Sequence, residues 1–88
     1  MADETDIAKA VVQIALANGG VCTFRRAYRE IPKHVALSAA NLAPSITRAG
    51  EPMWHQLVRN IKSHDGTPGN FIHDGHLEHV PGVGYRIP

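Results

Sequence analysis

Four polar side chains able to hydrogen-bond nucleic-acid bases and phosphates recur at helical spacing in EPMWHQLVRNIKSH, residues 51–64. They are Gln56, Arg59, Asn60 and Ser63, at positions i, i+3, i+4 and i+7. Side chains at this spacing share one face of a helix, from which amide and guanidinium groups can reach base edges in the major groove. The solvated side of any amphipathic helix looks much the same, so two interpretations stay open: a DNA-contacting face or a plain surface.

An apolar stripe on the opposite side of this stretch predicts the helix itself. The stripe consists of Trp54, Leu57, Val58 and Ile61. Its spacing fits a helix and does not fit the alternation of a strand. Pro52 suits a first helical turn, and Asp65-Gly66 supplies an end signal. We therefore predict a helix over about Pro52–His64, with its apolar side in a core and with His55 and Lys62 flanking the polar side.

The charge of the chain is concentrated in its middle third. The net charge of the 88 residues is only +1, but residues 1–24 carry −2, residues 25–62 carry +5 and residues 63–88 carry −2. A protein that works against a polyanion needs positive charge on one surface and not a high total, so this pattern favours a nucleic-acid face. Arg25, Arg26 and Arg29 are candidates for phosphate contacts, although solvent exposure alone would also explain them.

The bulk properties indicate one folded domain over residues 1–88, with disorder expected only in residues 1–5. The hydrophobic fraction is 43% and the charged fraction is 19%, as in ordinary folded proteins. The one cysteine, Cys22, cannot form an intrachain disulfide. No apolar run approaches the roughly 20 residues of a membrane span, and the first residues are acidic where a signal peptide is basic. We therefore expect a cytoplasmic protein without a membrane partner.

The N-terminal half predicts two helices, a short strand and a further helical turn. A first helix over about Asp6–Asn18 is capped by Thr5 or Asp6, and a short edge strand follows at Val21–Thr23. Thr23 also caps a second helix, which Pro32 is expected to stop after about two turns. Ser38 is expected to cap some helix around residues 37–42, with Pro44 closing it.

The C-terminal part predicts a loop followed by a β-hairpin. The run Asp65–Asn70 is dense in turn-forming residues, and Phe71 and Ile72 are expected to anchor it. In the tail HLEHVPGVGYRIP, two β-prone runs flank a Pro-Gly turn at Pro81–Gly84. The hairpin would pair with Val21–Thr23, which predicts an α+β fold with a small antiparallel sheet packed on a three-helix core.

This order of elements resembles the winged-helix DNA-binding family over essentially the whole chain. The tail VPGVGYRI is similar to the G-x-G-Y-R hairpin that ends the winged-helix domains of transcriptional response regulators. The pair Leu37-Ser38, the helix WHQLVRNIKSH and the hairpin are together similar to N-terminal winged-helix domains of Mrr-type and related restriction endonucleases. The resemblance implies that the Pro52–His64 helix enters the major groove of double-stranded DNA while the hairpin wing touches the adjacent backbone. It assigns DNA contacts to Gln56, Arg59, Asn60, Lys62 and Ser63.

The chain departs from that family in ways that favour binding over cleavage. The turn at Pro81–Gly84 is short and carries no cation, the loop Asp65–Asn70 is inserted, and no D…E-x-K constellation is present. We therefore expect no enzyme and no cofactor, but a DNA-binding regulator or the specificity part of a restriction-related system. The alternative is a protein-interaction module or homodimer on the same scaffold, since +1 is a low net charge for a DNA binder.

Metal binding and catalysis receive little support from the residues. The chain has six histidines, and His73, His76 and His79 lie three apart with Asp74 among them. In an extended strand, residues three apart point to opposite faces, so these side chains would not converge on one ion, and no metal is expected. Cys22 lies among apolar residues, which indicates a small buried hydrophobic residue and not a nucleophile. We therefore assign no catalytic residue.

Overall fold

Four helices and three short strands make up the chain. The computed structural model describes all of residues 1–88. Its elements are α1 (Glu4–Leu16), β1 (Val21–Thr23), α2 (Phe24–His34), α3 (Ala39–Leu42), α4 (Met53–Ser63), β2 (Glu78–Val80) and β3 (Gly84–Arg86). The strands form one antiparallel sheet in the order β1-β3-β2. The α+β class is therefore confirmed. None of the helices combines the length and the apolar content needed to cross a membrane.

Helix α1 begins two residues before the predicted start because Asp3 caps it. The Asp3 side chain accepts a hydrogen bond from the backbone N–H of Asp6 at 2.9 Å, and the Asp6 side chain accepts one from the N–H of Asp3 at 3.0 Å. This reciprocal capping box satisfies two of the free N–H groups at the start of the helix. Thr5 and Asp6, which the sequence suggested as caps, lie inside the first turn instead.

The N-terminal residues are held by α3, which differs from the disorder expected for residues 1–5. Ala2 is buried, and the Asn41 side chain accepts a hydrogen bond from its N–H at 3.0 Å and donates one to its carbonyl at 2.9 Å. Ser38 caps α3 as predicted, and its N–H and hydroxyl also donate to the side-chain amide oxygen of Asn41. The single turn of α3 therefore anchors the start of the chain.

Helix α2 begins as predicted and ends later. The Thr23 hydroxyl accepts a hydrogen bond from the N–H of Arg26 at 3.1 Å, which confirms the cap. The prediction that Pro32 stops the helix is wrong, since Pro32 lies inside it and the Val35 N–H still bonds to the Ile31 carbonyl at 3.0 Å. Proline removes one hydrogen bond, but burial of Ile31 holds the last turn against the core.

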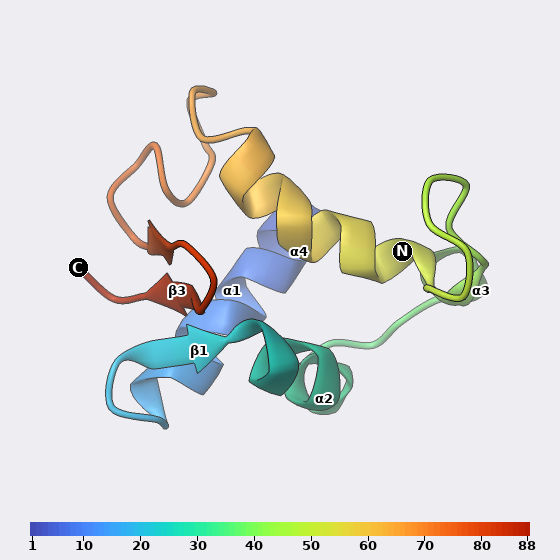
Figure 1. The fold of residues 1–88 in the computed structure, drawn as a ribbon, viewed down its shortest axis with the longest axis horizontal. Helices are drawn as coiled ribbons and strands as arrows, with labels where there is room; N and C mark the ends of the chain where they lie inside the picture. The colour runs from blue at the N-terminus through green and yellow to red at the C-terminus, as the bar shows by residue number, and fades with distance from the viewer.

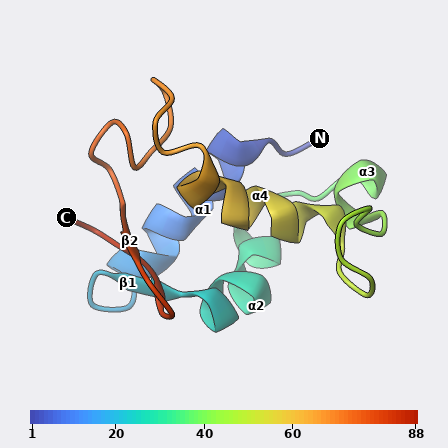
Figure 2. The same ribbon diagram turned by 45° about the horizontal axis from the view of Figure 1, so that its top comes forward.

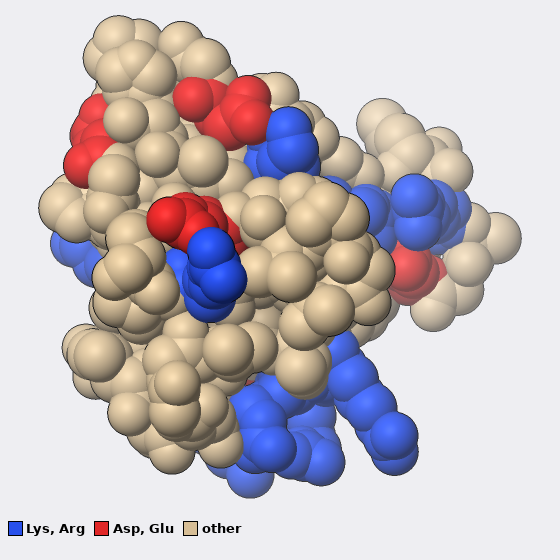
Figure 3. Space-filling view, turned by 60° about the vertical axis from the view of Figure 1, so that its left-hand side comes forward, with Lys and Arg blue, Asp and Glu red and all other residues tan.

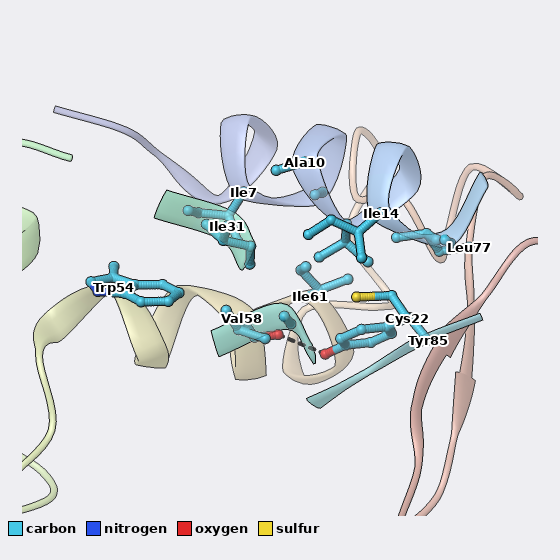
Figure 4. Packing of buried hydrophobic residues seen from close by; sticks show 14 of the residues in the cluster. Ile7, Ala10, Ile14, Cys22, Ile31, Trp54, Val58, Ile61, Leu77 and Tyr85 are labelled. Carbon is cyan, nitrogen blue, oxygen red and sulfur yellow. Dashed lines mark hydrogen bonds between the residues drawn. The ribbon is translucent and has the colours of Figure 1, made fainter. Parts of the chain in front are cut away.

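The apolar stripe of α4 lies in the core as predicted. Trp54, Val58 and Ile61 are at most 4% exposed, and Leu57 is half-buried against them. Figure 4 shows Trp54, Val58 and Ile61 on the side of α4 that faces the apolar side chains of α1, among them Ile7 and Ile14. Helix α1 is thus the central element, packed against both α2 and α4.

The hairpin and its partner strand also match the prediction. The Val83 N–H donates to the Val80 carbonyl at 3.0 Å, and Gly82 adopts φ 72° after Pro81, as a type II turn requires. The middle strand β3 pairs with β2 and with β1, with Cys22 opposite Tyr85.

One hydrogen bond joins the sheet to the middle of α4. The hydroxyl of Tyr85 donates to the carbonyl oxygen of Val58 at 2.6 Å, and Tyr85 is fully buried (Figure 4). Its ring meets Phe24 edge-on, with centroids 5.5 Å apart. Burial raises the pKa of Tyr85, so the hydroxyl keeps the proton that it donates.

The predicted loop after α4 is organised by a buried amide. The Asn70 side chain donates to the Ile61 carbonyl at 2.9 Å and accepts from the N–H groups of Ile72 and His73. Phe71 and Ile72 pack against the core as expected. Asn70 therefore ties the end of α4 to the segment that leads into β2.

The hairpin and α3 lie at opposite ends of the molecule. In Figures 1 and 2 the β2–β3 hairpin is at one end of α4, while α3 and the loop after it project at the other end. Helices α2 and α4 lie between these two ends.

Substituting Gly84 by alanine is expected to destabilise the fold by about 1–3 kcal/mol, as overpacking does. A Cβ at Gly84 would lie 2.1 Å from the Cys22 carbonyl oxygen and 2.8 Å from the Thr23 Cα, so β1 and β3 would have to separate. Urea denaturation measures the effect. The matched control is Gly66→Ala, where a Cβ meets nothing within 4 Å; equal free energies of unfolding for the two variants would contradict the prediction.

Candidate nucleic-acid interface

Helices α2 and α4 meet at an aromatic contact. The ring of Tyr28 stacks on the ring of His55, with centroids 4.2 Å apart and planes 27° from parallel. Tyr28 also lies edge-on to Trp54 at 6.1 Å. Tyr28 therefore marks the flank of α2 that faces α4, and His55 marks the flank of α4 that faces α2. Other residues can be placed relative to these two, because successive residues lie about 100° apart around a helix of 3.6 residues per turn.

The α2 flank beyond Tyr28 is cationic. Arg25 follows Phe24 and Arg29 follows Tyr28, so both lie one step further around the helix, toward solvent. Both are exposed, and Arg25 takes part in no salt bridge. With Arg26 and Thr23 they line a hollow of about 320 Å³ at the start of α2. In Figure 3, Lys and Arg side chains gather along the lower edge of the molecule, on its α2 side.

One carboxylate offsets part of this charge. Glu30 bonds the guanidinium groups of Arg26 at 3.0 Å and of Arg29 at 3.2 Å. These bonds hold the pKa of Glu30 below its usual value, with the Arg29 bond the largest cause. The α2 cluster therefore has three guanidinium groups and one carboxylate, for a net charge of +2.

The two cations of α4 are already paired. Arg59 donates to Glu51 at 2.9 Å and to Gln56 at 3.0 Å, and its side chain is only 18% exposed. Lys62 contacts Asp65 at 2.7 Å, which lowers the pKa of that carboxyl group. Both cations lie on the flank of α4 that carries His55, the flank turned toward α2.

The outer face of α4 is polar and bonded to itself. The Gln56 side chain donates to the side-chain amide oxygen of Asn60 at 2.8 Å, and the Ser63 hydroxyl donates to the backbone carbonyl of Arg59 at 3.4 Å. A bidentate contact with adenine requires the N–H and the oxygen of one amide together. Base reading by Gln56 or Asn60 would therefore compete with the bond between them.

The structure brings the eight predicted residues into two groups on neighbouring helices. Arg25, Arg26 and Arg29 share the start of α2, and Gln56, Arg59, Asn60, Lys62 and Ser63 share the solvent side of α4. Sequence reasoning missed Glu51 as the partner of Arg59. A signal was present in the spacing, because Glu51 comes just before α4, four residues ahead of His55 and eight ahead of Arg59.

Cys22 has the surroundings of a core residue. It is fully buried, and burial raises the pKa of its thiol to about 11. The thiol therefore stays protonated at neutral pH and is a poor nucleophile. The prediction that it is a buried small hydrophobe is confirmed. No group of three or more His, Cys, Asp or Glu side chains comes together as metal ligands would.

No family model, curated protein or solved structure matches the chain.

The position of His55 predicts an unusual titration. Burial lowers the pKa of His55, Glu51 raises it and Arg59 lowers it. We expect its NMR titration midpoint below the ordinary histidine value of about 6.5, and lower still in Glu51→Gln. Because the folded pKa is the lower one, the stability that neutral His55 contributes is present above about pH 6.5 and is lost as the pH falls. A midpoint at or above about 6.5 would contradict the burial of this ring.

Proposed function

We propose that this chain is a winged-helix domain that binds double-stranded DNA, with α4 as the recognition helix and the β2–β3 hairpin as a short wing. The order of elements and the sheet order β1-β3-β2 support the proposal, because they agree with the family that the sequence resembles. In such domains a helix enters the major groove while neighbouring elements contact phosphates.

The observation that carries the proposal is the juxtaposition of two cation-bearing flanks. Arg25 and Arg29 on α2, and Arg59 and Lys62 on α4, lie on either side of the Tyr28–His55 contact. A phosphate backbone running along this seam would meet guanidinium and ammonium groups from both helices. Such contacts supply affinity and fix the register of the protein, whereas base contacts supply sequence preference.

The hairpin has a minor part in the proposed complex. Its turn carries no cation, and Arg86 on β3 bonds Glu78 on β2 at 2.7 Å. The wing therefore offers little free positive charge to a minor groove. The phosphate contacts fall mainly to α2 and α4.

A second candidate function, protein binding, is favoured by the extent of ion pairing. Five of the nine Lys and Arg side chains already contact carboxylates. Titration with mixed-sequence duplex DNA at low salt separates the two candidates. A DNA binder gives salt-sensitive NMR shift changes on α2 and α4, and the absence of any shift would reject DNA binding.

Replacing Arg25 and Arg29 together by alanine is expected to weaken DNA binding and to flatten its salt dependence. Each lost phosphate contact removes about 0.9 from the slope of log K against log salt, so the pair removes about two. Fluorescence anisotropy with a labelled duplex at several salt concentrations measures the slope. The control is Lys9→Ala on α1, which lines a separate hollow with His34; an equal effect of this variant would count against a localised interface.

Glu51→Gln is expected to tighten DNA binding and to steepen its salt dependence by about one unit. The substitution removes the carboxylate that holds Arg59 at 2.9 Å and so frees its guanidinium for a phosphate. The comparison variant is Glu78→Gln on β2, which likewise removes one carboxylate and releases Arg86, a cation of the hairpin and not of α4. If Glu51→Gln binds no better than Glu78→Gln, Arg59 has no part in the interface.

A further inference from the structure

We propose that the loop Ser45–Gly50 is a further DNA-contacting element, which places an apolar side chain and a free cation beside the start of α4. This inference rests on the proposed function, and it extends the interface to residues that neither the sequence pattern nor the resemblance assigned. The loop projects beyond α3 in Figures 1 and 2.

The loop is closed by hydrogen bonds within the chain. Its two ends are joined by a β-bridge between Pro44 and Pro52, and the Ser45 N–H donates to the Glu51 carbonyl at 2.7 Å. Inside it, the Ser45 hydroxyl accepts from the N–H groups of Thr47 at 3.1 Å and Arg48 at 3.2 Å. A pre-formed loop loses little conformational entropy on binding.

The loop is bonded to the outer face of α4. The Thr47 hydroxyl donates to the side-chain amide oxygen of Gln56 at 3.3 Å, the same oxygen that accepts from Arg59. The N-terminal residues of a recognition helix are the ones that meet base edges. A duplex that contacts Gln56 would therefore also meet the tip of this loop.

The tip carries two groups that have no partner within the chain. Ile46 is 91% exposed, the most of any large apolar residue. Arg48 is exposed and takes part in no salt bridge, and the segment SITRAG has no carboxylate. In a groove, Ile46 could contact the apolar edges of bases and sugars, such as the thymine methyl group, while Arg48 contacts a phosphate.

Two variants test the two contacts separately by anisotropy with a mixed-sequence duplex. Arg48→Gln is expected to lower the salt slope by about one unit, the value of a single phosphate contact. Ile46→Ser is expected to weaken binding by about fivefold to tenfold with an unchanged slope, because it removes apolar contact area and no charge. Both side chains are exposed, so the fold of the free protein should not change.

The control is Lys9→Gln, which removes the same charge from α1. If Arg48→Gln behaves like Lys9→Gln, the phosphate contact is rejected, and if Ile46→Ser binds like the wild type, the apolar contact is rejected. The experiment distinguishes a wrong assignment of the loop from a wrong proposed function. If only the loop is wrongly assigned, the wild-type protein binds duplex DNA and binding still depends on Arg25 and Arg29. If the proposed function is wrong, the wild-type protein does not bind duplex DNA.

Discussion

The hydrogen bond from the Tyr85 hydroxyl to the Val58 carbonyl fixes the relation between the sheet and α4. It lies in the core, where an unpaired hydroxyl would cost about 1–3 kcal/mol. The carbonyl that it uses also belongs to the helix ladder, so the bond occupies a second lone pair without breaking the helix. Because β3 pairs with β1, and Thr23 both ends β1 and caps α2, this contact helps to set α2 against α4, together with the Tyr28–His55 stacking and the packing of both helices on α1.

The elements that depend on local pattern were predictable from the sequence. The stripe of Trp54, Val58 and Ile61 defines one face of α4 whatever the rest of the chain does, since its spacing admits only a helix. The Pro81-Gly82 turn likewise specifies the hairpin, because a residue with positive φ is needed there. The Thr23 cap follows from its place before a periodic run. The eight residues of the candidate interface were found by the same local reasoning, although their role in binding stays a prediction.

The features that sequence reasoning missed depend on contacts between distant residues. Asn41 is buried by its bonds to Ala2, 39 residues away, and Asn70 by its bond to Ile61 across a loop. An asparagine in a turn-rich stretch is as consistent with an exposed surface residue as with a buried one, so no local pattern reveals that Asn41 and Asn70 are anchors. Pro32 was misjudged for a related reason. The loss of one helical hydrogen bond is a local cost, whereas the burial of Ile31 that outweighs it is a tertiary effect.

The pairing of charges on α4 has a consequence for how selective the proposed interface would be. Arg59 is held by Glu51, and Gln56 is bonded to Asn60, so contacts of either side chain with DNA compete with bonds inside the chain. An adenine that replaces the bond between the two amides offsets its loss, whereas a poorly matched base leaves a donor or acceptor unpaired and is disfavoured. Arg25 has no such bond to break. In the proposed complex, phosphate contacts from both helices therefore give affinity for any duplex, while the amides of α4 add base contacts only where the bases repay the opening of the bond between them.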